Sequence, residues 1–128
     1  ADAFLESGSP EGIVYINAHG TGTPLNDAAE TAAIQKAMGA RVKDVLVSST
    51  KSMTGHMLGA AGAAEAIAAI LALKTGVVPP TAGLHQQDPA CDLDCVPVSA
   101  RRAGPVLALS VSMGFGGHNV CLAFRKTG

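Results

Sequence analysis

An apolar run over residues 57–73 constrains the fold most strongly, because one acidic residue, Glu65, interrupts it near its middle. The run predicts a helix over about 56–75 that ends at Gly76. The faces of this helix are apolar nearly all round, which is typical of a central, buried helix. The run falls short of the length of a membrane span and carries a charge, so we expect no membrane span.

Glu65 needs a partner, because burying an unpaired charge is costly. Lys51 precedes the helix and can fold back against it, so we favour a buried Lys51–Glu65 ion pair. The alternative is that Glu65 lines a water-filled crevice and pairs with nothing. His56 lies between the two on the same glycine-rich segment, 48–65, and three converging polar groups suggest part of a reaction centre.

Four short apolar runs predict the strands of a buried, mainly parallel sheet: 13–16, 45–47, 106–111 and 120–124. A helix after the first strand is expected to start at Asp27, with Glu30 completing a capping box, and to end at Gly39. The glycine-rich turn at 112–119 suggests that the last two strands pair antiparallel at the sheet edge. Residues 81–105 are expected to form an irregular loop. This pattern predicts the α/β class.

Polar loops follow the first two predicted strands. His19 lies on the first loop, and Lys51 and His56 lie on the second. Ligands of open α/β sheets bind beyond the carboxyl ends of the strands, so these three side chains are candidates for catalysis. A histidine at a strand end is about as often a structural hydrogen-bonding group. Two neutral imidazoles can hold an enolate or thioester oxygen without a metal.

Composition narrows the function further. A net charge of −1 gives no electrostatic case for binding nucleic acid or an anionic membrane. Cys91, Cys95 and Cys121 are an odd number without disulfide-framework spacing, which favours a reducing compartment. The Cys91–Cys95 pair has flanking aspartates but no second Cys or His pair at zinc spacing, so we expect ordinary thiols and no metal. None of the cysteines stands at a strand-to-helix turn, so the nucleophile of an active site is missing.

Three segments carry a family resemblance: YINAHGTGTPLNDAAE, VSSTKSMTGHMLGAAGAAEA and GFGGHN, in this order. They resemble the C-terminal half of a β-ketoacyl-[acyl-carrier-protein] synthase, closest to the elongating type II enzymes of fatty-acid synthesis and their polyketide relatives. The resemblance implies a thiolase-like fold, an αβαβα sandwich of two similar α/β halves. Residues 1–128 would form an incomplete C-terminal ketosynthase domain, either a fragment or a processed chain. The opening strand of this half would lie before Ala1.

The resemblance assigns roles to individual residues. His19 and His56 match the two active-site histidines that promote decarboxylation of malonyl-carrier protein and stabilise the resulting enolate. Lys51 matches the lysine that organises the site, and Glu65 matches the glutamate that pairs with it. Asp27 corresponds to a further polar residue of this network.

Other matches concern substrate binding and the oxyanion hole. Thr21 and Thr23 match threonines that contact the phosphopantetheine arm. Phe115 matches a gating phenylalanine, whose backbone N–H forms part of the oxyanion hole with that of the nucleophilic cysteine. That cysteine belongs to the N-terminal half, so the chain alone is expected to lack condensing activity. Met113, His118 and Cys95 depart from the commonest family pattern, which bears on pocket shape or packing.

The resemblance also implies partners and place. The reaction would be a decarboxylative Claisen condensation that needs no cofactor, in the cytoplasm, on acyl and malonyl groups delivered by acyl carrier protein. The N-terminal half of the same synthase and a homodimer partner, or a heterodimer partner in polyketide systems, would complete the enzyme. The alternative is a non-catalytic partner subunit of the chain-length-factor type. The presence of both histidines and Lys51 favours the enzyme, and fatty-acid and polyketide duty both remain open.

Overall fold

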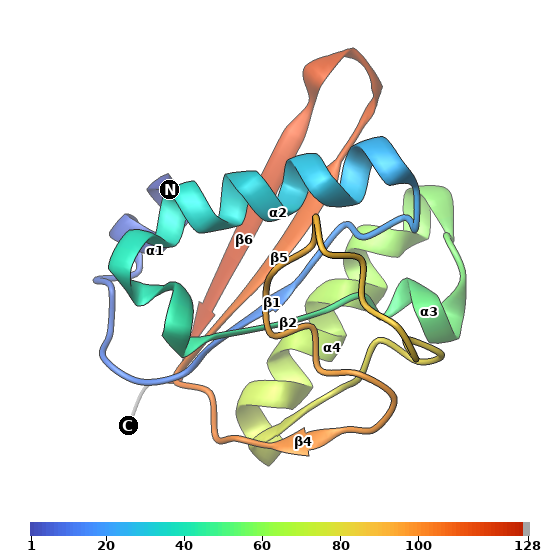
Figure 1. Ribbon diagram of the computed structural model, residues 1–128. Coiled ribbons are helices and arrows are strands. Elements are labelled where there is room, and N and C mark those ends of the chain that lie inside the picture. The colour runs from blue at the N-terminus through green and yellow to red at the C-terminus, as the bar shows by residue number, and fades with distance from the viewer. Residues whose placement is uncertain (127–128) are drawn as a thin grey trace.

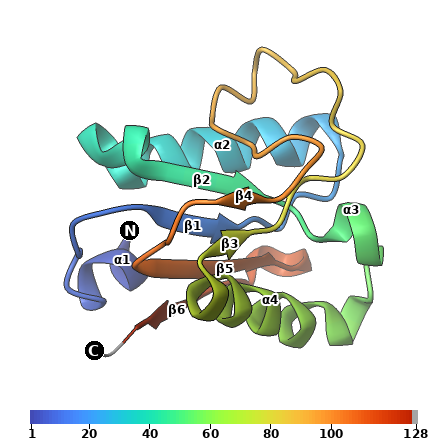
Figure 2. The same cartoon turned by 90° about the horizontal axis from the view of Figure 1, so that it is seen from below.

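Helices pack on both faces of a four-stranded sheet in the computed structural model, which describes residues 1–126 (Figure 1). The strand order is β2 (Val45–Ser48), β1 (Val14–Asn17), β5 (Leu107–Met113) and β6 (Asn119–Arg125). Helix α2 (Pro24–Met38) covers one face and α4 (Ala61–Thr75) covers the other (Figure 2). The predicted α/β class is confirmed.

The direction of the strands brings three loops to the same end of the sheet. β1 pairs in parallel with both β2 and β5, whereas β6 is antiparallel to β5 and forms the edge. The predicted parallel sheet and its antiparallel edge pair are therefore confirmed. The carboxyl ends of β1, β2 and β5 point the same way, and the β5–β6 hairpin projects beyond the helices (Figure 1).

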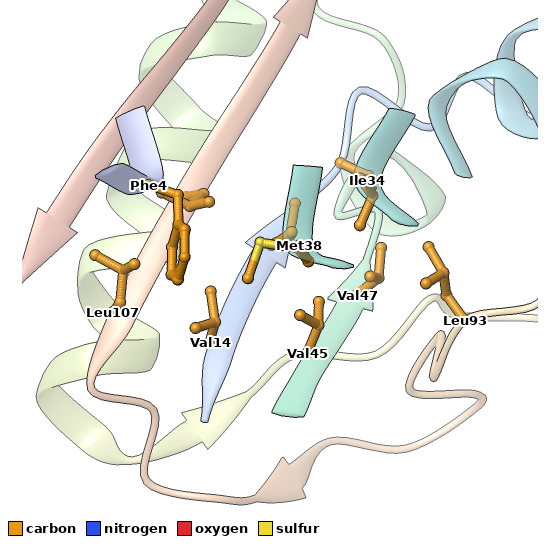
Figure 3. Packing of buried hydrophobic residues seen from close by; sticks show 11 residues of the cluster. Phe4, Val14, Ile34, Met38, Val45, Val47, Leu93 and Leu107 are labelled. Carbon is orange, nitrogen blue, oxygen red and sulfur yellow. The ribbon is translucent and has the colours of Figure 1, made fainter. Parts of the chain in front are cut away.

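β1, β2 and the first half of β5 are mostly apolar because they are buried on both faces. In β1, Val14 and Ile16 join the cluster under α2 and the short helix α1 (Asp2–Glu6), while Tyr15 between them joins the cluster under α4. Figure 3 shows the first cluster, where Phe4 and Met38 pack over the strand side chains. The alternation fixes the register of each strand, since a slip of one residue would exchange the two faces.

Helix α4 lies against the sheet through small side chains. Its buried residues recur every three or four positions and include Ala61, Glu65, Ala69 and Ala72. Ala69 is 0% exposed and belongs to the same cluster as Tyr15. The alanines at 61, 69 and 72 allow the helix backbone to approach the strands closely.

The opposite face of α4 is open. Ile67, Ile70 and Leu71 are 58%, 45% and 50% exposed. The expectation of a helix buried all round is therefore wrong for this chain, because the sheet covers one face only and no other element among residues 1–126 covers the second.

The helix also begins later than predicted. Lys51 starts a single helical turn, α3 (Lys51–Thr54), and a 3-10 turn at Leu58–Ala60 precedes α4. His56 therefore lies before the helix. The whole segment Leu58–Thr75 has a mean hydropathy of 1.4 and passes for a membrane span by length and composition, so the length argument was wrong. Its contacts with β1 and β5 identify it instead as a helix that covers a sheet.

The start of α2 corrects a second prediction. Thr23 is its N-cap and Pro24 its first residue, a position that suits the fixed φ of proline. Glu30 forms no capping box with Asp27, because its carboxylate binds backbone N–H groups of the loop after β1. The predicted end at Gly39 is confirmed.

The segment after α4 is more ordered than predicted. β3 (Val77–Val78) and β4 (Arg101–Arg102) form a small antiparallel pair. Between them, the Val47 N–H donates to the Asp94 carbonyl (2.8 Å), and Leu93 and Val96 are buried. The segment thus covers the outer edge of β2.

Replacing Ala69 by Leu is expected to lower the free energy of unfolding by about 1–3 kcal/mol, because the added atoms must displace α4 from the sheet. Ala63→Leu, on the exposed face of the same helix, is the matched control and should change that free energy by less than about 0.5 kcal/mol. Denaturant unfolding of the two variants measures both. Equal effects would contradict the close packing of α4 at Ala69.

Candidate active site

The loops that follow β1 and β2 bring the two predicted histidines together. The ring centroids of His19 and His56 are 5.6 Å apart, and the rings meet edge to face at 86°. The histidines lie on the loops after two different strands, so their proximity depends on the parallel pairing of β1 and β2. One small group placed between the rings could contact both of them.

Lys51 and Glu65 form the predicted buried ion pair beside these rings. The Lys51 Nζ donates to Glu65 Oε1, and the two side chains are 5% and 2% exposed. Lys51 begins α3, and Glu65 lies in the second turn of α4, so the pair ties the two helices together. The second carboxylate oxygen, Oε2, has no hydrogen-bond partner among the described residues.

A buried amide binds the backbone of Glu65 and the side chain of the residue before Lys51. Asn17, the last residue of β1, is 0% exposed. Its Nδ2 donates to Thr50 Oγ1 (3.0 Å) and to the Glu65 carbonyl (3.4 Å). Sequence reasoning missed this residue, although an amide that ends an otherwise apolar strand is a signal that could have found it.

The His56 ring is held by its own backbone. Its Nδ1 accepts the N–H of Leu58 at 3.1 Å. A neutral imidazole has one N–H, so this bond places the proton of His56 on Nε2. The Nε2–H is then available to donate to an oxygen of a ligand.

His19 is nearly buried, with 9% exposure, and its Nδ1 has no hydrogen-bond partner among residues 1–126. Burial lowers its pKa below the ordinary value of 6.5, and the charge of Lys51 and the neighbouring His56 lower it further. His19 is therefore neutral at pH 7 and can donate one hydrogen bond without carrying a charge.

Glu30 supports His19 from α2. Its Oε1 accepts the His19 N–H (2.7 Å), and its Oε2 accepts the Gly20 N–H (2.9 Å). The residue is 3% exposed, and burial raises the pKa of its carboxyl group. Sequence reasoning gave Glu30 a capping role and missed this one, because nothing in the pattern shows that the helix turns back over the loop.

The threonines and Asp27 lie at the outer part of the same loop. Thr21 and Thr23 share a hydrogen bond between their hydroxyls (3.2 Å). Asp27 Oδ1 accepts the Gly22 N–H (3.3 Å). Within the described residues Asp27 makes no hydrogen bond with the Lys51–Glu65 pair, so its direct effect is on the shape of the glycine loop.

A cavity of about 410 Å³ opens beside these groups. Lys51 and His56 line one side, α2 lines another, and the segment 84–95 closes it. Cys91 and Cys95 line it as free, half-buried thiols. Burial raises the pKa of Cys95 to about 11, so this thiol is protonated at neutral pH. The described residues contain no group of three or more His, Cys, Asp or Glu side chains that could hold a metal ion.

Phe115 lies at the tip of the β5–β6 hairpin, beyond the carboxyl end of β5. Its ring is fully exposed and packs against neither histidine. Gly116 and Gly117 have φ values of 78° and 81°, which favour glycine, and the Gly114 N–H donates to the His118 carbonyl (2.7 Å). The glycines therefore shape a tight turn that presents Phe115 on the outside.

Comparison with known proteins decides the family. A family model described as the beta-ketoacyl synthase C-terminal domain matches residues 4–85. The chain belongs to this family. The 3-oxoacyl-[acyl-carrier-protein] synthase 2 of Synechocystis sp. (strain ATCC 27184 / PCC 6803 / Kazusa) is 54% identical over 125 residues, which cover 97% of this chain and 30% of the relative.

Two solved structures extend the comparison. The ishigamide ketosynthase/chain length factor has a TM-score of 0.89 at 40% identity, over 98% of this chain and 31% of that one. A chain in the structure of a type II PKS acyl-carrier protein in complex with its ketosynthase has a TM-score of 0.90 at 36% identity. The match covers 98% of this chain and 31% of that one. The resemblance inferred from the sequence and the thiolase-like fold are thus confirmed, and the chain spans about 30% of the length of these relatives.

Lys51→Met is expected to lower the free energy of unfolding by about 3–5 kcal/mol, because it leaves Glu65 charged, buried and unpaired. The double variant Lys51→Met/Glu65→Gln removes both charges and should recover most of that loss. Denaturant unfolding at neutral pH compares them. A double variant no more stable than the single one would contradict the view that the isolated charge causes the loss.

The lowered pKa of His19 predicts a pH dependence of folding. Between that lowered pKa and 6.5 the unfolded chain binds more protons than the folded one, so His19 lowers stability as pH falls through this window and has no such effect above it. His19→Gln should flatten this part of the stability curve. An NMR titration of the ring gives the pKa directly, and a midpoint at or above 6.5 would contradict the burial argument.

Proposed function

We propose that this chain is the C-terminal part of a β-ketoacyl-[acyl-carrier-protein] synthase, an acyltransferase of fatty-acid or polyketide biosynthesis. It would help to condense malonyl-carrier protein with an enzyme-bound acyl group, with loss of CO2. The observation that carries the proposal is the pair of imidazoles 5.6 Å apart, beside the buried Lys51–Glu65 pair, in a member of this family.

The first step is decarboxylation. When the malonyl group loses CO2, the electron pair of the broken C–C bond moves onto the thioester and forms an enolate. His19 and His56 donate N–H groups to the enolate oxygen. Neutral donors suit this task because they stabilise charge that develops in the transition state without attracting the malonyl carboxylate as an ion pair. The lowered pKa of His19 and the Nδ1 bond of His56 support this assignment.

The second step is condensation. The enolate carbon attacks the acyl thioester on a cysteine, and the thiolate leaves as the tetrahedral intermediate collapses. We place that cysteine in the N-terminal half, because no thiol in the described part of the chain lies at the N-terminus of a helix. The backbone N–H of Phe115 would contribute to the oxyanion hole of this step.

The partners follow from the same proposal. Acyl carrier protein would deliver its phosphopantetheine arm past Thr21 and Thr23 to the histidines. The N-terminal half would pack on the open face of α4. A second copy, or a related subunit, would complete a dimer in the cytoplasm. No metal or cofactor has a step in this reaction.

The alternative is a partner subunit of the chain-length-factor type. Such a subunit lacks the nucleophile and needs no enolate site. The geometry favours the enzyme, because His19, His56 and Lys51 are all present and lie together. The residue at the strand-to-helix elbow of the upstream half separates the two, since a cysteine there is required for the enzyme.

In the complete synthase, His19→Ala and His56→Ala are each expected to lower the rate of malonyl-carrier-protein decarboxylation by at least about 100-fold. The physical reason is the loss of an N–H donor to the enolate oxygen. His85→Ala is the matched control, because His85 is exposed on the segment outside the histidine pair. Release of CO2 from a labelled malonyl group measures the step.

The isolated chain forms the second arm of this experiment. It should show no condensation with acyl- and malonyl-carrier proteins, since the acyl group has no cysteine to occupy. Turnover by the isolated chain would overturn the placement of the nucleophile outside it. Full activity of both alanine variants would overturn the proposed role of the histidines.

A further inference from the structure

Ser49 links the three segments that surround the site. It follows β2 directly and is 8% exposed. Its hydroxyl donates to the carbonyl of Gly20 (2.8 Å), the residue after His19. Its N–H donates to Thr81 Oγ1 (3.1 Å), on a residue that also lines the cavity. No proposed step of the reaction uses Ser49, yet every polar group it carries is engaged with the site's surroundings.

The carbonyl of Ser49 completes the set. It accepts the hydroxyl of Ser52 (2.7 Å), and the Ser52 hydroxyl in turn accepts the N–H of Ala82 (2.8 Å). Ser52 lies on the same turn as Lys51. The start of α3 is therefore fastened to residues 81–82 on one side and to the loop of His19 on the other.

Gly20 lies so close to Ser49 that a side chain at position 20 would clash. A Cβ added at Gly20 would lie 2.6 Å from Ser49 Cβ and 2.8 Å from Ser49 Oγ, which is closer than real side chains approach. The φ of Gly20 is +40°, a conformation that other residues rarely adopt. Both facts show that the two loops touch here at a distance only glycine permits.

The contact between Ser49 and Gly20 lies directly after His19 in the chain, where the strand pairing no longer holds the loop. Before His19, the Ala18 N–H donates to the Ser48 carbonyl (2.9 Å) and extends the pairing of β1 with β2. After His19, the ladder has ended, and the Ser49 hydroxyl is the group that holds the next carbonyl. His19 thus lies between two hydrogen bonds, one made by Ser48, the last residue of β2, and one made by Ser49, the residue after it.

We propose that Ser49 is a positioning residue, whose hydroxyl fixes the loop of His19 against the turn of Lys51 and His56 so that both imidazoles face one enolate oxygen. The inference rests on the proposed function. Two donors on separate loops reach the same oxygen only if the loops keep their spacing, and a misplacement of about 1 Å can lower a rate by 100-fold.

The test is Ser49→Ala in the complete synthase, followed through separate steps. The expected result is a loss of about tenfold in kcat for malonyl decarboxylation, with KM for malonyl-carrier protein unchanged and transfer of the acyl group to the enzyme unchanged. Ser48→Ala is the matched control. Ser48 precedes Ser49, is also buried, and loses a hydrogen bond of similar length to Tyr15 (3.0 Å) without touching Gly20.

Gly20→Ala tests the same contact from the other loop, because its methyl group must push the loops apart. It should show the same loss confined to decarboxylation, and the double variant with Ser49→Ala should be no worse than Gly20→Ala alone. Multiplying effects, equal losses in Ser48→Ala and Ser49→Ala, or losses spread evenly over all steps would overturn the inference. A wild-type synthase without decarboxylation would overturn the proposed function itself, and this inference with it.

Discussion

The buried ion pair of Lys51 and Glu65 is the interaction on which the rest of the site depends. Both charges are almost fully removed from water, so neither can remain in place without the other. The pair forces the chain after β2 to turn back onto α4, and this turn places His56 opposite His19. The same lysine charge contributes to keeping His19 neutral. A single contact thus links the path of the backbone to the protonation of a proposed catalytic group, whose pKa burial lowers most.

Physical arguments of short range predicted much of this from the sequence. The apolar runs gave the strands of the main sheet, and the cost of an unpaired charge gave the partner of Glu65. Contacts between distant segments could not be predicted in this way. Glu30 looked like part of a capping box, because no local pattern reveals that its carboxylate reaches the loop after β1. Asn17 and Ser49 were missed because their roles depend on which loops lie side by side.

Three surfaces of this chain are exposed together. The apolar face of α4, the edge strand β6 and the ring of Phe115 are all open to solvent, although each is of a kind that proteins usually cover. The chain spans about 30% of the length of the curated relative described above. In the proposed synthase, the N-terminal half would cover the open face of α4 and complete the site, so the exposed surfaces and the missing nucleophile would have one cause.

The thiols that line the cavity are poorly suited to accept an acyl group. An acyl group needs a thiolate to accept it, and thiolates form where a helix N-terminus or a cation lowers the pKa. Cys95 lies in the opposite environment, since burial and the nearby Cys91 and Asp94 all raise its pKa, to about 11. His56 and this protonated thiol therefore line the same cavity. Under the proposed function this thiol would not compete for the acyl group, which a cysteine of the N-terminal half would accept.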